Sequence, residues 1–340
     1  MDYKILYLFF FFSVLAVCSA MPLMAQRLLI GNIAYESPSL IAPVALYRTM
    51  PSDGDDWTFS ITGWTGAVQW ERVIDPTFTS AVTLEVTPMN SHSSDILFRN
   101  GIRDKALNFF DATMQFRAGM NIQSTEFWST NIGVIGIYES VKRLPEEVLE
   151  YWRSPFAGID ILTSYIDTRS DDPMIGRWDG IKLFGHAQVL AGFEHATAWW
   201  RITAISEAGR KFGPVFLHGG GSAFLGNSLN IVNQFLVGGC WDLLGAAALS
   251  GYHYAEFRLN RAAVFQAAAD VCIAGSTELG LRAGYLLSDE VATFGGALKM
   301  MTTISGFTFE IGIGLPKAVL VSRDFGKIVG FGGMTFGLFP

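Results

Sequence analysis

Several stretches of the chain alternate apolar residues with polar or small ones. The clearest spans residues 307–315, where every odd position is apolar and the even positions hold threonine, glutamate or glycine. Successive side chains of a β-strand point to opposite faces, so this pattern predicts a strand with one apolar and one polar face. Residues 278–285 follow the same rule. We expect Leu279, Leu281, Ala283 and Tyr285 to face outward and Glu278, Gly280, Arg282 and Gly284 to face inward.

Weaker alternation predicts further strands along the whole chain. Their ranges are 29–35, 44–48, 59–70, 82–87, 107–122, 127–138, 158–167, 181–191, 198–206, 215–224, 262–273, 294–304 and 327–338. Roughly 14 to 16 strands, with 16 favoured, fit the spacing of about 20 residues per strand and connection in membrane barrels. The predicted fold class is all-β: a transmembrane antiparallel β-barrel. A soluble β-sandwich remains open, although polar inner faces on so many strands do not favour it.

One stretch departs from this pattern. Leu144, Val148, Leu149 and Trp152 recur at helical spacing, and Pro145 suits a first helical turn. We expect a short helix on an extracellular loop, either packed on the loop or acting as a lid.

The N-terminus has the features of an export signal. Lys4 precedes an apolar run over residues 5–17, and Ala20 and Ala25 offer cleavage points. We favour cleavage after Ala25, which makes residues 1–25 a signal peptide and residues 26–340 one barrel domain. Cys18 suggests a lipoprotein signal only faintly, because valine precedes it.

Composition points to a membrane and away from nucleic acid. Half of the residues are hydrophobic, only 16% are charged, and the mean hydropathy is +0.31. After the leader, no run reaches the roughly 18 apolar residues that a membrane-spanning helix requires, so a crossing must use strands. The net charge of −7 disfavours phosphate backbones as partners. We therefore expect a multi-pass barrel in a Gram-negative outer membrane, in contact with lipid and inserted by barrel assembly machinery.

No residue pattern specifies catalysis. The run His218-Gly219-Gly220-Gly221 is similar to an esterase oxyanion loop, but the chain has no G-x-S-x-G nucleophile elbow. These glycines are expected in a strand that lies close to a neighbour. No histidines pair at metal-ligand spacing. We expect no catalytic residues, no metal, no cofactor and no enzymatic activity.

The most informative region runs from residue 235 to residue 270. A short apolar stretch leads to Gly238 and Gly239, and a second stretch holds Leu249, Ser250, Gly251 and Tyr252. Glu256 follows, before a long strand that starts at Arg261. This arrangement resembles the outer-membrane assembly and secretion superfamily of BamA, TamA and the two-partner secretion transporters, also known as the bacterial surface antigen family. It looks closest to the barrels of bacterial patatin-like proteins.

Two other stretches carry the resemblance, which covers roughly residues 160–340. Residues 165–173 with Gly180 look like the family's acidic turn before a glycine-led strand, here built on Asp167, Arg169 and Asp171. Residues 294–338 look like its three closing strands. The resemblance implies that the glycine-rich loop folds into the lumen before the fifth strand from the C-terminus.

The chain departs from the family at one ion pair. The family loop carries an arginine that meets a carboxylate on a neighbouring strand. Ser250 stands in place of the arginine, and the carboxylate would fall near Ala283 or Gly284. Losing both partners avoids a buried unpaired charge, which would cost several kcal/mol.

The resemblance implies a function in membrane biogenesis or in translocation of protein or lipid. Neither periplasmic POTRA repeats nor a patatin domain is recognisable, so we expect a barrel-only member with a separate periplasmic partner. A passive channel for small solutes is the alternative, indicated by the inward polar residues Lys182, Gln188, Glu278, Arg282 and Glu310. A structural anchor for a separately encoded partner is a third hypothesis.

Overall fold

The computed structural model describes residues 26–338 with internal gaps. The gaps are residues 37–38, 51–54, 63–64, 76–79, 94–97, 100–101, 104–108, 144–151, 173–176, 194–197, 228–232, 240–247, 254–255 and 306. The expected signal peptide and most of the expected helix at 144–153 lie outside the described residues, and Trp152 and Arg153 belong to a strand.

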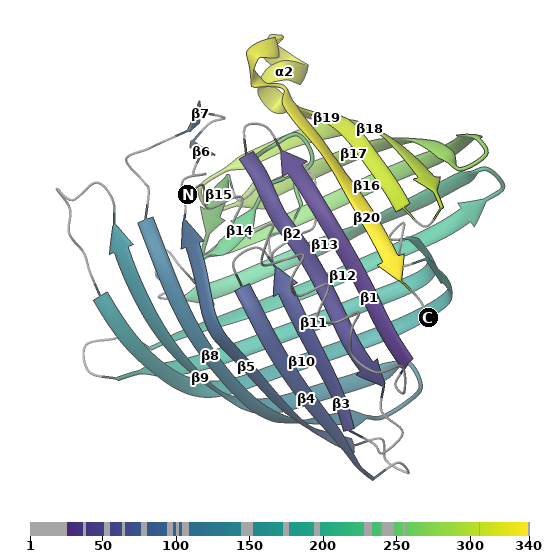
Figure 1. The fold of residues 1–340 in the computed structure, drawn as a ribbon. Helices are drawn as coiled ribbons and strands as arrows, with labels where there is room; N and C mark the ends of the chain where they lie inside the picture. Colours follow the sequence, from purple (N-terminus) through teal and green to yellow (C-terminus); the bar gives the residue numbers. More distant parts are fainter. Residues whose placement is uncertain are drawn as a thin grey trace, which may run out of the picture.

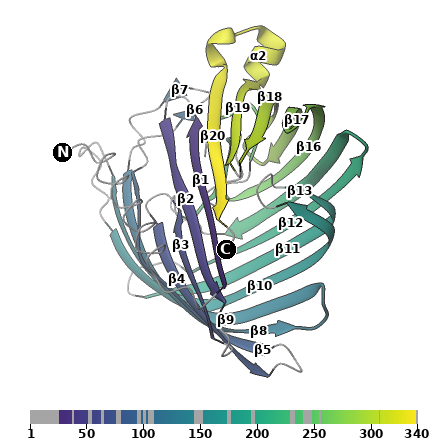
Figure 2. The ribbon, with the colours of Figure 1, turned by 45° about the vertical axis from the view of Figure 1, so that its right-hand side comes forward.

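Sixteen of the described strands form one antiparallel barrel (Figures 1 and 2). In order around the wall they are β1 (Gln26–Glu36), β2 (Ser39–Met50), β3 (Asp55–Thr62), β4 (Thr65–Asp75), β5 (Ser80–Ser93), β8 (Phe109–Gln123), β9 (Trp128–Arg143), β10 (Trp152–Asp172), β11 (Arg177–Gly192), β12 (Trp199–Phe212), β13 (Val215–Asn227), β16 (Arg261–Ala274), β17 (Thr277–Ser288), β18 (Ala292–Ile304), β19 (Phe307–Pro316) and β20 (Val329–Leu338). β1 pairs with β20 from Leu29↔Leu338 to Glu36↔Phe331, which closes the sheet. The predicted all-β barrel and the favoured strand number are confirmed.

Among the described residues, four short strands and two helical turns lie outside the wall. They are β6 (Phe98–Arg99), β7 (Ile102–Arg103), β14 (Phe235–Val237), β15 (Phe257–Leu259), α2 (Lys317–Ser322) and η3 (Phe325–Lys327). The sequence did not predict α2 or η3. No described helix is long and apolar enough to cross a membrane.

The two ends of the barrel differ. At the end where β1 begins and β20 ends, the connections between strands have two to four residues; we call this the turn end. The opposite end, the loop end, carries the long connections 94–108, 144–151, 228–260 and 317–328. Bacterial outer-membrane barrels place short turns in the periplasm and long loops outside.

Strand alternation separates an apolar outer surface from a mixed inner one. The predicted faces of residues 278–285 and 307–315 are confirmed: their large apolar side chains are exposed apart from Leu315, which is half-buried, whereas Thr308 on the opposite face is buried. Comparable outward side chains encircle much of the wall and form what we call the outer belt: Val134, Ile159, Val189, Ile202, Leu225, Phe265, Leu281, Leu298 and Ile311. Such a belt is the surface that a transmembrane barrel presents to lipid.

Glycine allows close approach of neighbouring strands in β13. His218 to Gly221 lie within this strand, as expected. A Cβ on Gly220 would overlap the carbonyl oxygen of Ser206 on β12. The glycine run therefore serves strand packing.

Candidate functional site in the barrel lumen

The connection between β13 and β16 enters the barrel. We call its described residues within 233–260 the lumen loop. β14 and β15 form a small hairpin in it, with Phe235 opposite Leu259 and Val237 opposite Phe257 (Figure 1). The loop precedes the fifth strand from the C-terminus and packs against inward side chains of the wall. This is the inward-folding loop that the sequence predicted.

Backbone hydrogen bonds bring together the loop residues that the sequence singled out. The Gly239 amide donates to the Tyr252 carbonyl at 3.1 Å, and the Leu249 amide donates to the Gly239 carbonyl at 3.0 Å. Gly238, Gly239 and Gly251 have φ angles of 130°, 97° and 96°. Only glycine adopts such angles readily, so these positions fix the path of the loop.

Glu256 closes the turn that follows Tyr252. Its carboxylate accepts a hydrogen bond from the His253 amide at 3.1 Å, and the Glu256 amide donates to the His253 carbonyl at 3.1 Å. The side chain is buried. Glu256 thus shapes the return of the loop toward β16.

The loop backbone lies directly on the inner wall where the wall lacks side chains. A Cβ on Gly284 would lie 3.1 Å from Leu249 Cδ1 and 3.4 Å from the Ser250 nitrogen. A Cβ on Gly295 would overlap the Ser250 carbonyl oxygen. Gly251 in turn approaches the Leu315 carbonyl, which a Cβ would meet at 2.6 Å. We call Gly284, Gly295 and the Leu315 backbone the docking strip.

The docking strip occupies the place where the family's ion pair was expected. Ser250 is buried against Gly284, one of the two positions at which the carboxylate was expected to fall. Loop backbone on wall glycines occupies the place where the resemblance implied two charged side chains. This contact is short-ranged and depends on shape, because loop backbone lies against wall glycines.

Tyr252 joins the loop to β18 of the wall and to the start of α2. Its hydroxyl donates to the Phe294 carbonyl at 3.1 Å and shares a hydrogen bond with the Thr293 hydroxyl. The same oxygen accepts the backbone amide of Lys317, at the start of α2, at 3.4 Å. On the other side of the loop, the Gln266 amide donates to the Ala248 carbonyl.

Apolar side chains of the loop fill part of the lumen. Val237 and Leu249 have no exposed surface, and they pack with inward wall side chains of β9 to β13, β16 and β17. We call the whole cluster the lumen plug: Phe235, Val237, Leu249, Tyr252 and Leu259 from the loop, and Ile135, Ile137, Phe156, Leu190, Trp199, Phe224, Ala262, Val264 and Leu286 from the wall. Each large side chain so buried contributes about 1.5–3 kcal/mol. The plug therefore holds the loop firmly.

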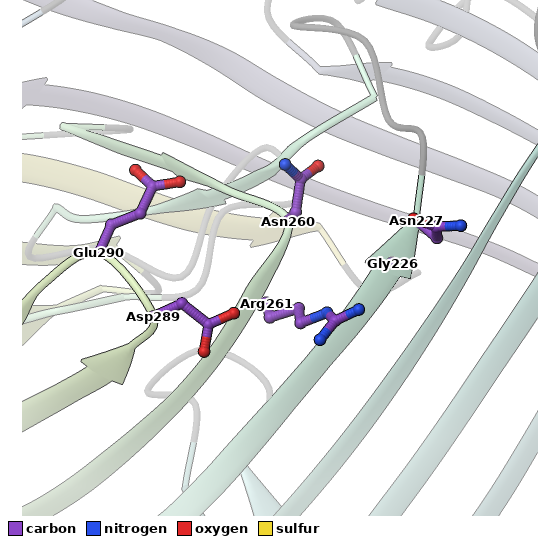
Figure 3. A pocket seen from close by; sticks show the side chains of 6 residues that line it. All are labelled: Gly226, Asn227, Asn260, Arg261, Asp289 and Glu290. Carbon is purple, nitrogen blue, oxygen red and sulfur yellow. The ribbon is translucent and has the colours of Figure 1, made fainter.

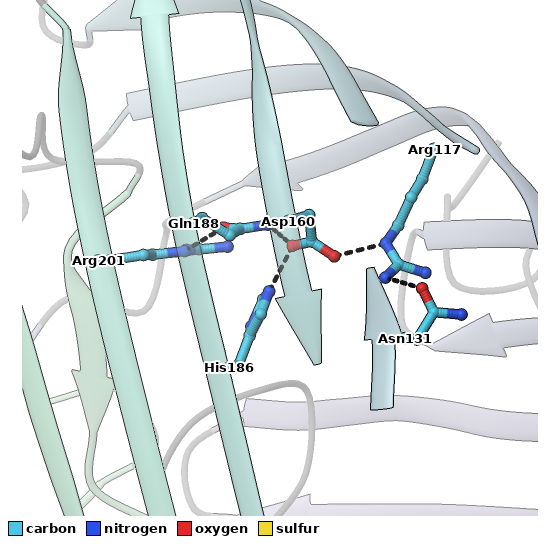
Figure 4. A network of polar contacts seen from close by, with 6 residues as sticks. All are labelled: Arg117, Asn131, Asp160, His186, Gln188 and Arg201. Carbon is cyan, nitrogen blue, oxygen red and sulfur yellow. Dashed lines mark hydrogen bonds and ion pairs between the residues drawn. The ribbon is translucent and has the colours of Figure 1, made fainter. Parts of the chain in front are cut away.

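A polar network continues along the inner wall beside the plug. Asp160, which is 1% exposed, accepts hydrogen bonds from Arg117 Nε at 2.5 Å and Gln188 Nε2 at 2.6 Å, and lies 2.6 Å from His186 Nε2 (Figure 4). Arg201 donates to Gln188, and Arg117 also donates to Asn131, each at 2.5 Å. We call these six residues the Asp160 network. It links β8 through β12.

A second polar group lies on β13 and β16 to β19. Arg282 donates to both oxygens of Asp270, at 2.7 and 2.9 Å, and His218 lies 3.7 Å from Asp270. Lys299 pairs with Glu310 at 3.2 Å. A Cβ on Gly280 would lie 2.8 Å from Lys299 Cγ and would overlap Asp270, so glycine leaves room for both side chains.

These networks change the reading of the inward polar residues. Gln188, Arg282 and Glu310 face inward as expected, and each bonds to a charged side chain of a neighbouring strand: Gln188 to Asp160, Arg282 to Asp270 and Glu310 to Lys299. Asp160, Arg117 and Asp270 were missed. The sequence could have indicated them, because each lies an even number of positions from an inward-facing residue of the same strand.

The residues expected in an acidic turn lie in two strands, β10 and β11. β10 continues through Asp172, so Asp167, Arg169 and Asp171 belong to its turn-end half, with Asp171 opposite Trp178. The predicted turn was wrong there, because cross-strand pairing with β11 extends past these polar residues. Gly180 has a φ of 149° and would overlap the Asp167 carbonyl if it carried a Cβ. Asp167, Arg169 and Gly180 line a hollow of about 550 Å³ with residues of β12 and β13.

A smaller polar pocket of about 240 Å³ lies at the loop end (Figure 3). Gly226 and Asn227 end β13, Asn260 and Arg261 lead into β16, and Asp289 and Glu290 form the turn after β17. It holds no nucleophile with a paired base. Among the described residues, no three His, Cys, Asp or Glu side chains are placed to hold a metal ion.

Comparison with known proteins identifies the fold. No protein-family model and no curated protein matches the sequence. The structure is similar to BamA from Haemophilus ducreyi lacking POTRA domains 1–3, with a TM-score of 0.67 and 8% identity over 92% of this chain and 70% of that one. It is also similar to CdiB from Acinetobacter baumannii, with a TM-score of 0.56 and 8% identity over 93% and 60% of the two chains. CdiB from Escherichia coli gives 0.55 and 11% over 91% and 63%.

The chain thus spans less than two thirds of either CdiB chain. The likeness to patatin-linked barrels stays a prediction. At these identities the comparisons establish the fold alone. The chain has the barrel fold of BamA and CdiB.

Proposed function

We propose that this protein is an outer-membrane barrel that acts in membrane biogenesis or in translocation of protein or lipid, together with a separate periplasmic partner. The observation that carries the proposal is the lumen loop, seated on the docking strip inside a barrel with the fold of BamA and CdiB. The outer belt supports the membrane location.

The lumen plug argues for a gated barrel. Leu249 and Val237 are fully buried among wall side chains, so passage through this part of the lumen requires the loop to move. A passive channel needs a continuous water-filled path instead. The paired charges of the Asp160 network likewise leave fewer free polar groups for solutes than an open pore would offer.

Planar-bilayer conductance of the refolded protein tests the plug. We expect low conductance from the full chain and a large steady conductance when residues 238–251 are deleted. A control variant replaces the same residues by a Gly/Ser linker of equal length, which keeps chain length but removes Leu249 and the docking contacts. It should conduct like the deletion. High conductance that neither change alters would favour the passive channel.

Biogenesis or translocation needs its own assay. Vesicles that hold the protein should speed the insertion of an unfolded small barrel protein or the transbilayer movement of a labelled phospholipid. The same two rates are measured for the linker variant, whose loop is undocked, as the matched comparison. Neither activity in vesicles, together with an unchanged outer-membrane proteome in cells that lack the protein, would contradict the proposal.

A further inference from the structure

The connection between β19 and β20 exposes large apolar side chains outside the barrel wall. We call residues 317–328 the surface segment; it comprises α2, η3 and the residues around them. Val321 is 62% and Phe325 67% exposed, and Leu320 and Ile328 are exposed too. Four such side chains in one short segment are costly to leave in water, so a surface that covers them is expected.

Contacts at both ends of α2 fix the shape of the segment, and this shape turns the apolar side chains outward. Val319 is buried, which turns the opposite side of α2 outward. Arg323 ends the helix with a φ of 56°, and its amide donates to the Val319 carbonyl at 3.2 Å. At the other end, the Lys317 amide is held by Tyr252.

The height of the segment places it at a membrane surface. β19 and β20 have 10 residues each, whereas β10 on the far part of the wall has 21. A strand of about 9–11 residues just crosses the hydrocarbon core. α2 follows β19 directly and lies immediately beyond the ends of β19 and β20 (Figure 2). The segment therefore starts just beyond the exposed side chains of β19, Ile311 of the outer belt and Ile313.

The charge of the segment suits lipid headgroups. It carries Lys317, Arg323 and Lys327 but only one acidic residue, Asp324, in a chain whose net charge is −7. Apolar side chains combined with basic ones are the composition of segments that lie in the plane of a membrane interface. A protein partner would not require this combination, nor continuity with the outer belt.

We propose that the surface segment lies in the outer leaflet, with Leu320, Val321, Phe325 and Ile328 inserted among lipid chains and its basic residues near phosphate-bearing headgroups. The inference rests on the proposed membrane location of the barrel. It adds a second, peripheral contact with lipid next to β20, the strand that closes the barrel.

Spin labels at single cysteines test the depth of the segment. Cys240 and Cys272 are first replaced by alanine, and labels are then placed in turn at Phe325, at Val321, at Ile311 in the outer belt and at Asp289 in another loop-end turn. The protein is reconstituted into vesicles that contain phosphatidylglycerol. We expect labels at Phe325 and Val321 to be accessible to oxygen and several-fold less accessible to a water-soluble nickel chelate than the label at Asp289.

The Ile311 label separates two kinds of failure. If Ile311 reports hydrocarbon while Phe325 and Asp289 are equally open to nickel, the surface segment lies in water and this inference is wrong. If Ile311 also reports water, the membrane location itself is wrong. A triple variant, Lys317→Gln with Arg323→Gln and Lys327→Gln, tests the headgroup contact. Its Phe325 label should become more accessible to nickel in phosphatidylglycerol vesicles; no change would overturn the role of the charges.

Discussion

At the scale of single residues, glycine decides where the lumen loop can lie. Gly284 and Gly295 leave the inner faces of β17 and β18 bare, and the backbone around Ser250 fills that space. A side chain on the wall would compete with the loop for the same volume. The loop is thus positioned by what the wall lacks.

Substituting Gly295 should lift the loop. A valine there would meet the Ser250 carbonyl and the Tyr252 ring, so we expect Gly295→Val to raise bilayer conductance toward that of the loop deletion. The control is Gly136→Ala on β9, where a Cβ would meet nothing within 4 Å. Unchanged conductance in the Gly295 variant would show that the docking strip does not hold the plug.

At the scale of elements, charged side chains of adjacent strands pair with one another on the lumen side of the wall. The Asp160 network joins five consecutive strands, β8 to β12, and its ion pair connects residues 43 positions apart in sequence. Strand alternation predicted the inward faces of β17 and β19. It could not reveal which inward charges meet, because that depends on register between strands, including bulges such as the one between Thr168 and Ser170.

Breaking this network should destabilise the barrel. Asp160→Asn leaves Arg117 buried with no carboxylate beside it, and losing one partner of a buried pair costs about 3–5 kcal/mol. We expect a clear fall in the free energy of unfolding, measured in urea with the protein in lipid vesicles. The exposed Asp167, changed to Asn, is the matched control and should have little effect. Equal stability of both variants would mean that the lumen solvates Arg117 freely.

Other elements show where sequence patterns stop being informative. The loop's glycines and Tyr252 were predictable because they form a compact local motif. The extension of β10 through Asp172 was not, since polar residues that suit a turn also suit a strand end whose backbone is paired. The six-residue helix α2 was not predicted because one and a half turns show too little periodicity, and Val319 and Val321 also suit a strand.

At the scale of the whole molecule, one strand pair closes the barrel. β1 meets β20 over eight residue pairs, fewer than the sixteen between β10 and β11. We expect cysteines at Asn32 and Thr335, which lie opposite each other, to form a disulfide on mild oxidation. Cysteines at Asn32 and Gly333, offset along β20, are the control and should cross-link far less. The reverse preference would contradict the register, and no cross-link in either would contradict closure.

Tyr252 couples the position of the lumen loop to the position of the surface segment. Its hydroxyl holds the first amide of the surface segment while its ring belongs to the lumen plug. Any free energy that lipid gives to the segment's bound position then also favours the seated loop, and withdrawal of the loop must weaken the segment's hold on lipid by the same amount. The fraction of molecules whose loop is seated in the lumen would therefore differ between detergent and a bilayer.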